Sequence, residues 1–353
     1  MLLPSAAFMT TARPRALSIW LWLVAALVVA MVVIGGITRL TESGLSITEW
    51  RPVSGTLPPL TDAAWQAEFA NYRRIPQYEA FNHGMTLAGF KAIFFWEYLH
   101  RLLGRVIGLA VALPLLWFAA RRQVPAGYGL RLFALLTLIG LQGTLGWIMV
   151  RSGLSARTEV APLWLAIHLL TALFTLGGLV WTALDLRALA GNRFAAPAHL
   201  RLVAVAAMAL LAVQLAFGAL TAGLRAGYAF ASWPLMGDTL FPAGTPMLAP
   251  AWRNAIDNPI VVQFFHRWFA FAAAAGLVWL AMRAHRAGST AGRAVIALVA
   301  LQIALGIATL LSGVALDLAI AHQANAALLL IATVVAAHAV GGARTSGPAV
   351  SRL

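Results

Sequence analysis

The chain has 353 residues, of which 61% are hydrophobic and 10% are charged, whereas soluble domains carry about 25% charged residues. An ordinary soluble domain is therefore excluded. The formal charge is +14, but the basic residues are scattered between apolar runs, and nucleic-acid binding needs them clustered on one face. Because the chain has no Cys, thiolate metal sites, iron–sulfur clusters and disulfides are excluded, and any metal chemistry must rest on His and carboxylates.

Eight apolar stretches are each long enough to cross a bilayer, which takes about 20 residues. The sequence predicts an all-α integral membrane protein with eight transmembrane helices at residues 18–37, 92–118, 132–150, 162–184, 202–222, 259–282, 294–313 and 319–340. Arg13 and Arg15 precede the first stretch, and no convincing small-residue cleavage site follows it. This favours a retained first helix over a removed signal peptide.

The distribution of Arg predicts the orientation in the membrane. With the N-terminus in the cytoplasm, the inside segments hold 13 Arg and one acid, Asp185, while the outside segments hold nine basic and nine acidic residues. Cytoplasmic loops carry such a positive excess, so we expect both termini in the cytoplasm. The N-terminus lacks an extended Arg- and Ser-rich leader, which favours a bacterial inner membrane.

Two outside loops are long and are expected to form a cap: residues 38–91 and 223–258. Within the first, Trp65, Phe69 and Tyr72 fall at positions i, i+4 and i+7. This spacing predicts an amphipathic helix that lies on the outer leaflet and carries no chemistry.

The chain also contains an internal repeat. GITRLTESGLSITEWRPVSGTLP, from Gly36, is echoed by ALTAGLRAGYAFASWPLMGDTLFP, from Ala219, and the pairs Leu141-Gln142 and His100-Arg101 recur as Leu301-Gln302 and His266-Arg267. The sequence therefore predicts two tandem four-helix bundles, residues 1–190 and 191–353. Since four is even, both halves enter the membrane from the same side and are related by a pseudo-two-fold axis along its normal.

Four histidines lie at matched positions on the even-numbered predicted helices, about three to nine residues from their outer ends: His100, His168, His266 and His322. At about 1.5 Å per residue they share a similar depth toward the periplasmic side. A single transmembrane His is often a packing residue. Two facing imidazoles in each bundle are instead the usual way to hold a haem iron. The other four have no counterpart in the repeat and are interpreted as ordinary: His83, His199, His285 and His338.

Small residues follow two of these histidines at one and two turns. Gly104 and Gly108 follow His100, and the same offsets from His266 give alanines. A flat macrocycle could lie against such faces, although the two glycines alone would also suit a GxxxG helix contact.

Charged residues flank the predicted sites. Arg101, Arg105 and Arg267 lie within predicted helices, where haem propionates would be fitting partners for guanidinium groups. Glu97 precedes His100 by three residues, whereas the equivalent residue before His266 is Gln263. Two interpretations of Glu97 stay open, a proton acceptor or donor and a partner in a hydrogen bond or ion pair. The asymmetry favours a reacting first half and an electron-transfer haem in the second.

The segments GGITRLTESGLSITEWRPVSGTLPPL, WQAEFANYRRIPQYEAFNHGMTLAGFKAIFFWEYLHRLLGR, AIHLL, FFHRWFA and AHQANA resemble the haem A synthase family, in particular its mitochondrial and alphaproteobacterial branch. The resemblance covers residues 18 to 340. Members of the family with Cys pairs in an outside loop link them to redox turnover, and that part of the mechanism cannot be transferred to a chain without Cys.

The resemblance implies that a ring methyl of haem O is oxidised to a formyl group, which gives haem A for cytochrome oxidase assembly. It assigns His100 and His168 to the substrate haem, His266 and His322 to the axial positions of haem b, and the catalytic role to Glu97. The partners it implies are haem O synthase as the source of substrate, an electron donor such as quinol, and the lipid bilayer.

Two questions stay open at this point. A bis-His iron is coordinatively saturated, so either His100 or His168 moves away during turnover, or oxidation proceeds through the ring with Glu97 taking the methyl proton. The alternative functions are a dihaem cytochrome b-type electron carrier and, less compatible with parallel repeats, a transporter.

Overall fold

The computed structural model describes residues 11–342, and the regular elements of this range are helices. Eight are long and apolar enough to cross a membrane: α2 (Pro14–Leu40), α5 (Leu87–Ala120), α6 (Gly129–Arg151), α7 (Pro162–Gly191), α8 (Leu202–Gly223), α10 (Pro259–Arg286), α11 (Ala291–Leu311) and α12 (Leu316–Gly342). The predicted all-α membrane fold is confirmed, and each predicted stretch coincides with one helix. The predicted cytoplasmic termini fall largely on residues 1–10 and 343–353, outside the described range.

Two helices extend five or more residues beyond a predicted end. α5 begins at Leu87, where the Thr86 side chain accepts a hydrogen bond from the Gly89 amide and caps the helix. α7 continues to Gly191, and the part beyond the predicted end begins with two buried residues, Asp185 and Leu186. The first long loop is therefore residues 41–86, shorter than the predicted 38–91.

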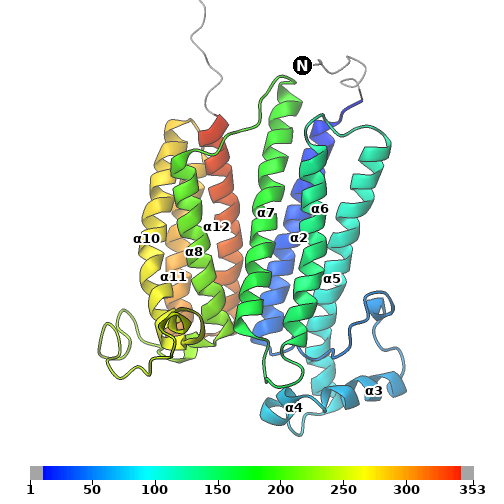
Figure 1. The fold of residues 1–353 in the computed structure, drawn as a ribbon, viewed down its shortest axis with the longest axis vertical. Coiled ribbons are helices and arrows are strands. Elements are labelled where there is room, and N and C mark those ends of the chain that lie inside the picture. Colours follow the sequence, from blue (N-terminus) through cyan, green and yellow to red (C-terminus); the bar gives the residue numbers. More distant parts are fainter. Residues whose placement is uncertain (1–10, 343–353) are drawn as a thin grey trace, which may run out of the picture.

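The eight spanning helices form two groups (Figure 1). In the first, α2 packs on α5 and α7, and α6 packs on α7; in the second, α10 packs on α8 and α11, and α11 packs on α12. The groups meet where α7 contacts α8 and α12, and where α12 contacts α2. Four helices thus line the boundary between the halves.

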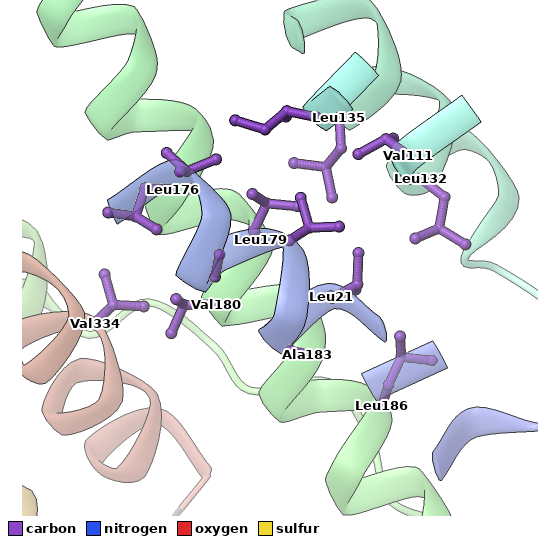
Figure 2. Close-up of a cluster of buried hydrophobic side chains, with 14 of the residues drawn as sticks. Leu21, Val111, Leu132, Leu135, Leu176, Leu179, Val180, Ala183, Leu186 and Val334 are labelled. Carbon is purple, nitrogen blue, oxygen red and sulfur yellow. The ribbon is translucent and has the colours of Figure 1, made fainter. Parts of the chain in front are cut away.

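The core of the first group is completed by side chains of the second, Ala327 and Val334 of α12. Figure 2 shows Leu176, Leu179 and Val180 of α7 beside Leu21 of α2, with Val334 of α12 reaching the same cluster. Apolar burial of this kind stabilises by about 25 cal/mol per Å². The two groups therefore share a continuous hydrophobic interior.

Both long loops lie at one end of the helices, opposite the start of α2 and the end of α12 (Figure 1), and we call this the loop end. Short helices occupy these loops: η1 (Ser54–Thr56), α3 (Asp62–Tyr72), α4 (Pro76–Phe81), η2 (Ala226–Tyr228), η3 (Ala251–Arg253) and α9 (Asn254–Asp257). The predicted amphipathic helix is confirmed as α3, which Thr61 caps.

The apolar face of α3 packs on protein, so the predicted placement on the outer leaflet is wrong for this face. Phe69 stacks on Phe90 of the extended α5, with ring centres 4.9 Å apart, and Tyr72 is fully buried beside them. Burial raises the pKa of Tyr72 to about 12, so its hydroxyl stays neutral and donates to Gln77. A helix stripe of period 3.6 can pack on lipid or on protein equally well.

Candidate functional site

All four predicted histidines lie on spanning helices near the loop end. His168, His266 and His322 are the seventh, eighth and seventh residues of α7, α10 and α12. His100 is the fourteenth residue of α5 because α5 extends further beyond the bundle. Matched depth along parallel helices is what the sequence predicts for these side chains.

Each imidazole packs against a glycine of the preceding spanning helix. A Cβ at Gly35 would lie 3.0 Å from Cε1 of His100, and the corresponding distances are 3.3 Å from Gly146 to His168, 3.0 Å from Gly218 to His266 and 2.9 Å from Gly306 to His322. Each glycine is the sixth residue from the end of its helix. The same close approach between a helix backbone and an imidazole therefore occurs four times. Any residue with a Cβ at the glycine position would displace the imidazole ring.

A glutamine one turn before the glycine holds three of the four imidazoles. The Gln214 amide nitrogen lies 3.1 Å from Nδ1 of His266 and donates to the His266 carbonyl. Gln302 contacts Nδ1 of His322 at 3.3 Å and donates to the carbonyl of the same residue. The amide nitrogen is a donor, so it pairs with Nδ1 when that atom is unprotonated. When Nδ1 carries the proton, the amide oxygen can accept from it once the amide has turned over.

His168 has the same arrangement. In the orientation that lets both amide atoms pair, the Gln142 nitrogen lies 3.0 Å from Nδ1 of His168 and 3.2 Å from its carbonyl oxygen. At the equivalent position before Gly35 the chain has Met31. Nδ1 of His100 is buried without a hydrogen-bond partner.

The second-half pair has the spacing of two imidazoles that share a metal. The ring centres of His266 and His322 are 6.4 Å apart and their planes are perpendicular. Two imidazoles that bind one iron through bonds of about 2 Å each have ring centres roughly 6 Å apart. The residues present therefore fit a bis-His iron.

A cavity of about 290 Å³ opens beside this pair and is lined mostly by apolar side chains. Ala270 and Ala274, one and two turns from His266, line it as the sequence predicts. Five polar atoms of its lining residues are buried without partners. Three can donate, Nε of Arg267, Oγ1 of Thr221 and Oγ1 of Thr309, and two are acceptors, Oε1 of Gln214 and Oε1 of Gln263. A mostly apolar wall with a few unpaired donors suits a macrocycle that has polar groups at its edge.

Open space lies beside the first-half pair. A Cβ at Gly108 would meet no heavy atom within 4 Å, and one at Gly104 would meet only the end of Met31, 3.6 Å away. This face of α5 therefore does not pack tightly against another helix as a GxxxG motif would. Gly104 and Gly108 leave space one and two turns from His100.

Glu97 is buried and accepts four hydrogen bonds. Its Oε2 accepts from Ser46 Oγ and from the Ile47 amide, both at 2.7 Å. Its Oε1 accepts from Nε and Nη2 of Arg101 at 3.1 and 2.6 Å. Of the two interpretations from the sequence, the paired one describes this geometry, and the loop after α2 supplies half of the partners.

The three predicted propionate ligands hold the loops to the helices. Arg101 donates to the carbonyls of Ile47 and Glu49, and Arg105 donates to those of Arg51 and Pro52. In the second half Arg267 donates to the carbonyls of Phe230, Ser232 and Leu235. Nη1 of Arg105 and Nε of Arg267 are buried and unpaired, so each half keeps one Arg donor that a propionate could use.

The other histidines lie elsewhere. His83 is 75% exposed beside Glu79. His338, interpreted as ordinary from the sequence, has a buried partner, because its Nε2 lies 2.9 Å from Oδ1 of Asp185. That pair is at the end of the molecule away from the loops and joins α12 to α7.

Comparison with known proteins identifies the family. The family model described as "Cytochrome oxidase assembly protein" (COX15-CtaA) matches residues 18–334. The chain belongs to this family. Relatives named Heme A synthase are 56% identical in Rhizorhabdus wittichii over 335 residues (95% of this chain, 96% of the relative), 55% in Sphingopyxis alaskensis over 330 residues (93% of both) and 50% in Novosphingobium aromaticivorans over 344 residues (95% and 98%).

The family match covers all four histidines, all four facing glycines and Glu97, and it confirms the resemblance to haem A synthases. Sequence reasoning did not identify the glutamines as partners of the imidazoles. The signal was available as Q-x-x-x-G, which occurs at Gln142, Gln214 and Gln302, with M-x-x-x-G at Met31. This spacing becomes informative only when the packing of the helices is known, because that packing places each glycine against a His.

Proposed function

We propose that this protein is an oxidoreductase that converts haem O to haem A by oxidising a ring methyl to a formyl group. Family membership and relatives named Heme A synthase support this reaction. The observation that carries it is the repeated pairing of imidazoles with glycines at one depth, which gives each half one pair of histidines. In this proposal residues 1–190 form the substrate half and residues 191–353 the half with the resident cofactor.

His266 and His322 would hold haem b in the second half. The 6.4 Å separation of their rings supports this assignment, and Gln214 and Gln302 would keep the imidazoles in place. The unpaired Nε of Arg267 would donate to a propionate. When bound, haem b would supply a one-electron carrier.

His100 and His168 would hold the substrate, haem O, in the first half. Gly104 and Gly108 leave space for the flat ring, and Arg105 would turn its unpaired Nη1 toward a propionate. Because the substrate carries a long isoprenoid tail, we expect it to enter sideways from the lipid, between helices.

Glu97 would accept the proton released from the ring methyl. It faces four donors and no acceptor, so one donor must leave before an oxygen can take up a proton. The Ser46 hydroxyl can rotate about its own bond, so it is the partner that can leave Oε2 while Arg101 and the Ile47 amide keep the carboxylate in position. Arg101 would then serve the substrate half by orienting Glu97 rather than by binding a propionate directly.

The loop end would face the periplasm of a bacterial inner membrane. The excess of Arg in the segments at the opposite end supports this orientation. Both sites would then lie toward the periplasmic side. With O2 as the oxidant of a monooxygenase-type reaction, a membrane donor such as quinol could supply the electrons that reduce its second oxygen atom to water. The substrate would be delivered by haem O synthase.

The reaction is tested by expressing the chain in a bacterium that makes haem O but no haem A, followed by chromatography of acid–acetone extracts. We expect a haem A peak that depends on the chain. Haem O that accumulates unchanged beside well-expressed protein would contradict the proposal. A purified protein that holds only haem b in both halves would instead favour the dihaem electron carrier.

A further inference from the structure

Three of the four imidazoles pair with a glutamine, and His100 does not. Gln142, Gln214 and Gln302 each contact Nδ1 and the backbone carbonyl of their histidine. Met31 occupies the equivalent position in α2, and Nδ1 of His100 is buried without a partner. We propose that His100 is the releasable ligand of the substrate pair and that Met31 is the positioning residue that leaves it so. This inference rests on the proposed function.

The amide contact fixes an imidazole in two ways. It pairs with Nδ1, through its nitrogen when Nδ1 is unprotonated and through its oxygen when Nδ1 carries the proton. Rotation of the ring then breaks a hydrogen bond that a buried group cannot replace with water. Gln302 is held further by Asn325, whose amide donates to Gln302 Oε1 at 2.7 Å. The His322 ring therefore belongs to a connected polar network.

Met31 offers none of this restraint. A thioether is at best a weak acceptor, and an unbranched side chain with three rotatable bonds yields readily. Met31 lies against α5 near Gly104, one turn from His100, and is only partly buried. The His100 ring packs on Gly35 without such a bond, and turning it away breaks no hydrogen bond at Nδ1.

The asymmetry answers the question that the sequence leaves open. A saturated bis-His iron must lose a ligand before it can bind anything else. His168 shares the glutamine contact of the second-half pair, so His100 is the imidazole that moves. Glu97, the catalytic candidate, and His100, the histidine without a glutamine contact, lie in the same half.

Carbon monoxide binding to the reduced protein measures ligand release directly. The purified full-length protein is loaded with extracted haem A. Its formyl group shifts the absorption bands to longer wavelengths than those of haem b, so these bands report on the first-half site alone. Met31→Gln restores the missing amide, Met31→Leu is the matched control without an amide, and Gln142→Met is the reciprocal variant.

We expect Met31→Gln to lower the affinity of the haem A site for carbon monoxide about fivefold, which corresponds to about 1 kcal/mol, while Met31→Leu stays within twofold of the unsubstituted protein. Gln142→Met should raise the affinity of this site for carbon monoxide. If Met31→Gln does not fold, Gln142→Met alone tests the inference. The haem b bands serve as an internal reference and should not change.

The inference is overturned if Met31→Gln and Met31→Leu bind carbon monoxide equally, or if Gln142→Met has no effect. A different result would overturn the proposed function itself, namely haem A that does not bind, or binds equally well after His100→Ala. The two failures are therefore distinguishable.

Discussion

Each imidazole keeps its position because the residue that faces it is glycine, which has a hydrogen atom where other residues have a Cβ. Replacing glycine with alanine inside a helix ordinarily stabilises it, by about 1 kcal/mol. At these four positions the added Cβ would enter the space of the ring. Loss of function at such a site therefore reflects displacement of the imidazole and not a weakened helix.

Gly306→Ala should lower the haem b content of the purified protein by at least half. A Cβ at Gly306 would lie 2.9 Å from Cε1 of His322, which forces the ring away from the position that faces His266. Haem b per protein is measured from the pyridine haemochrome spectrum. Gly143→Ala is the control, because a Cβ there meets no atom within 4 Å; equal losses in both variants would contradict the account.

Glu97→Gln should abolish formyl formation while haem b stays bound. The glutamine keeps the shape of the side chain, but its NH₂ group cannot accept a proton or a hydrogen bond from Ser46 or Arg101. Extracted haems are separated by chromatography, with haem O expected in place of haem A. Unchanged haem A formation would remove Glu97 from the reaction.

At the scale of elements, the first loop matters because it partners the helix that carries the reacting residues. Phe69 and Tyr72 of α3 bury the start of α5, and Ser46 and Ile47 of the same loop hold Glu97. The cap is thus part of the substrate half rather than a separate surface feature. Its packing should control how well Glu97 is oriented.

Phe69→Ala should loosen the loop without unfolding the bundle. Removing a buried aromatic ring costs about 3–5 kcal/mol, and the cluster formed by α3, α4 and α5 would lose its centre. We expect faster proteolysis within residues 41–86 and lower haem A formation. Phe81→Ala, at a side chain that is 49% exposed, should change neither; comparable cleavage in both variants would show that the cap is not held by this cluster.

The sequence predicts the spanning helices and the four histidines well, because length, apolarity and repeat position are local properties. It does not predict where Arg101 and Arg267 donate, since their acceptors are loop carbonyls whose path depends on the whole fold. The partners of Glu97 come from a loop 50 residues earlier. Long-range pairing of this kind leaves no periodic signal in the chain.

At the scale of the molecule, polar contacts join the two halves at both ends. At the loop end Arg225, after α8, pairs with Glu42 and Glu159 of the first half at 2.7 and 2.6 Å. At the opposite end Asp185 of α7 pairs with Arg131 of α6 and His338 of α12. Together with the shared apolar core, these contacts fix the distance between the two proposed haem sites.

Asp185→Asn should destabilise the whole protein by about 2 kcal/mol. Breaking a buried ion pair costs about 3–5 kcal/mol, and the effect is smaller here because the Arg131 side chain is 39% exposed. Thermal unfolding in detergent measures the change. Asp257→Asn, in an exposed pair with Arg253 within the loop, should have almost no effect; similar shifts would mean that Asp185 does not join the halves.

The central claim is that each half holds one haem between its own two histidines. An optical spectrum of the purified protein, combined with haem extraction, tests it most directly in His100→Ala and His266→Ala. We predict that His100→Ala loses haem O and haem A but keeps haem b, and that His266→Ala loses haem b. Loss of the same pigment in both variants, or of none in either, would contradict the account.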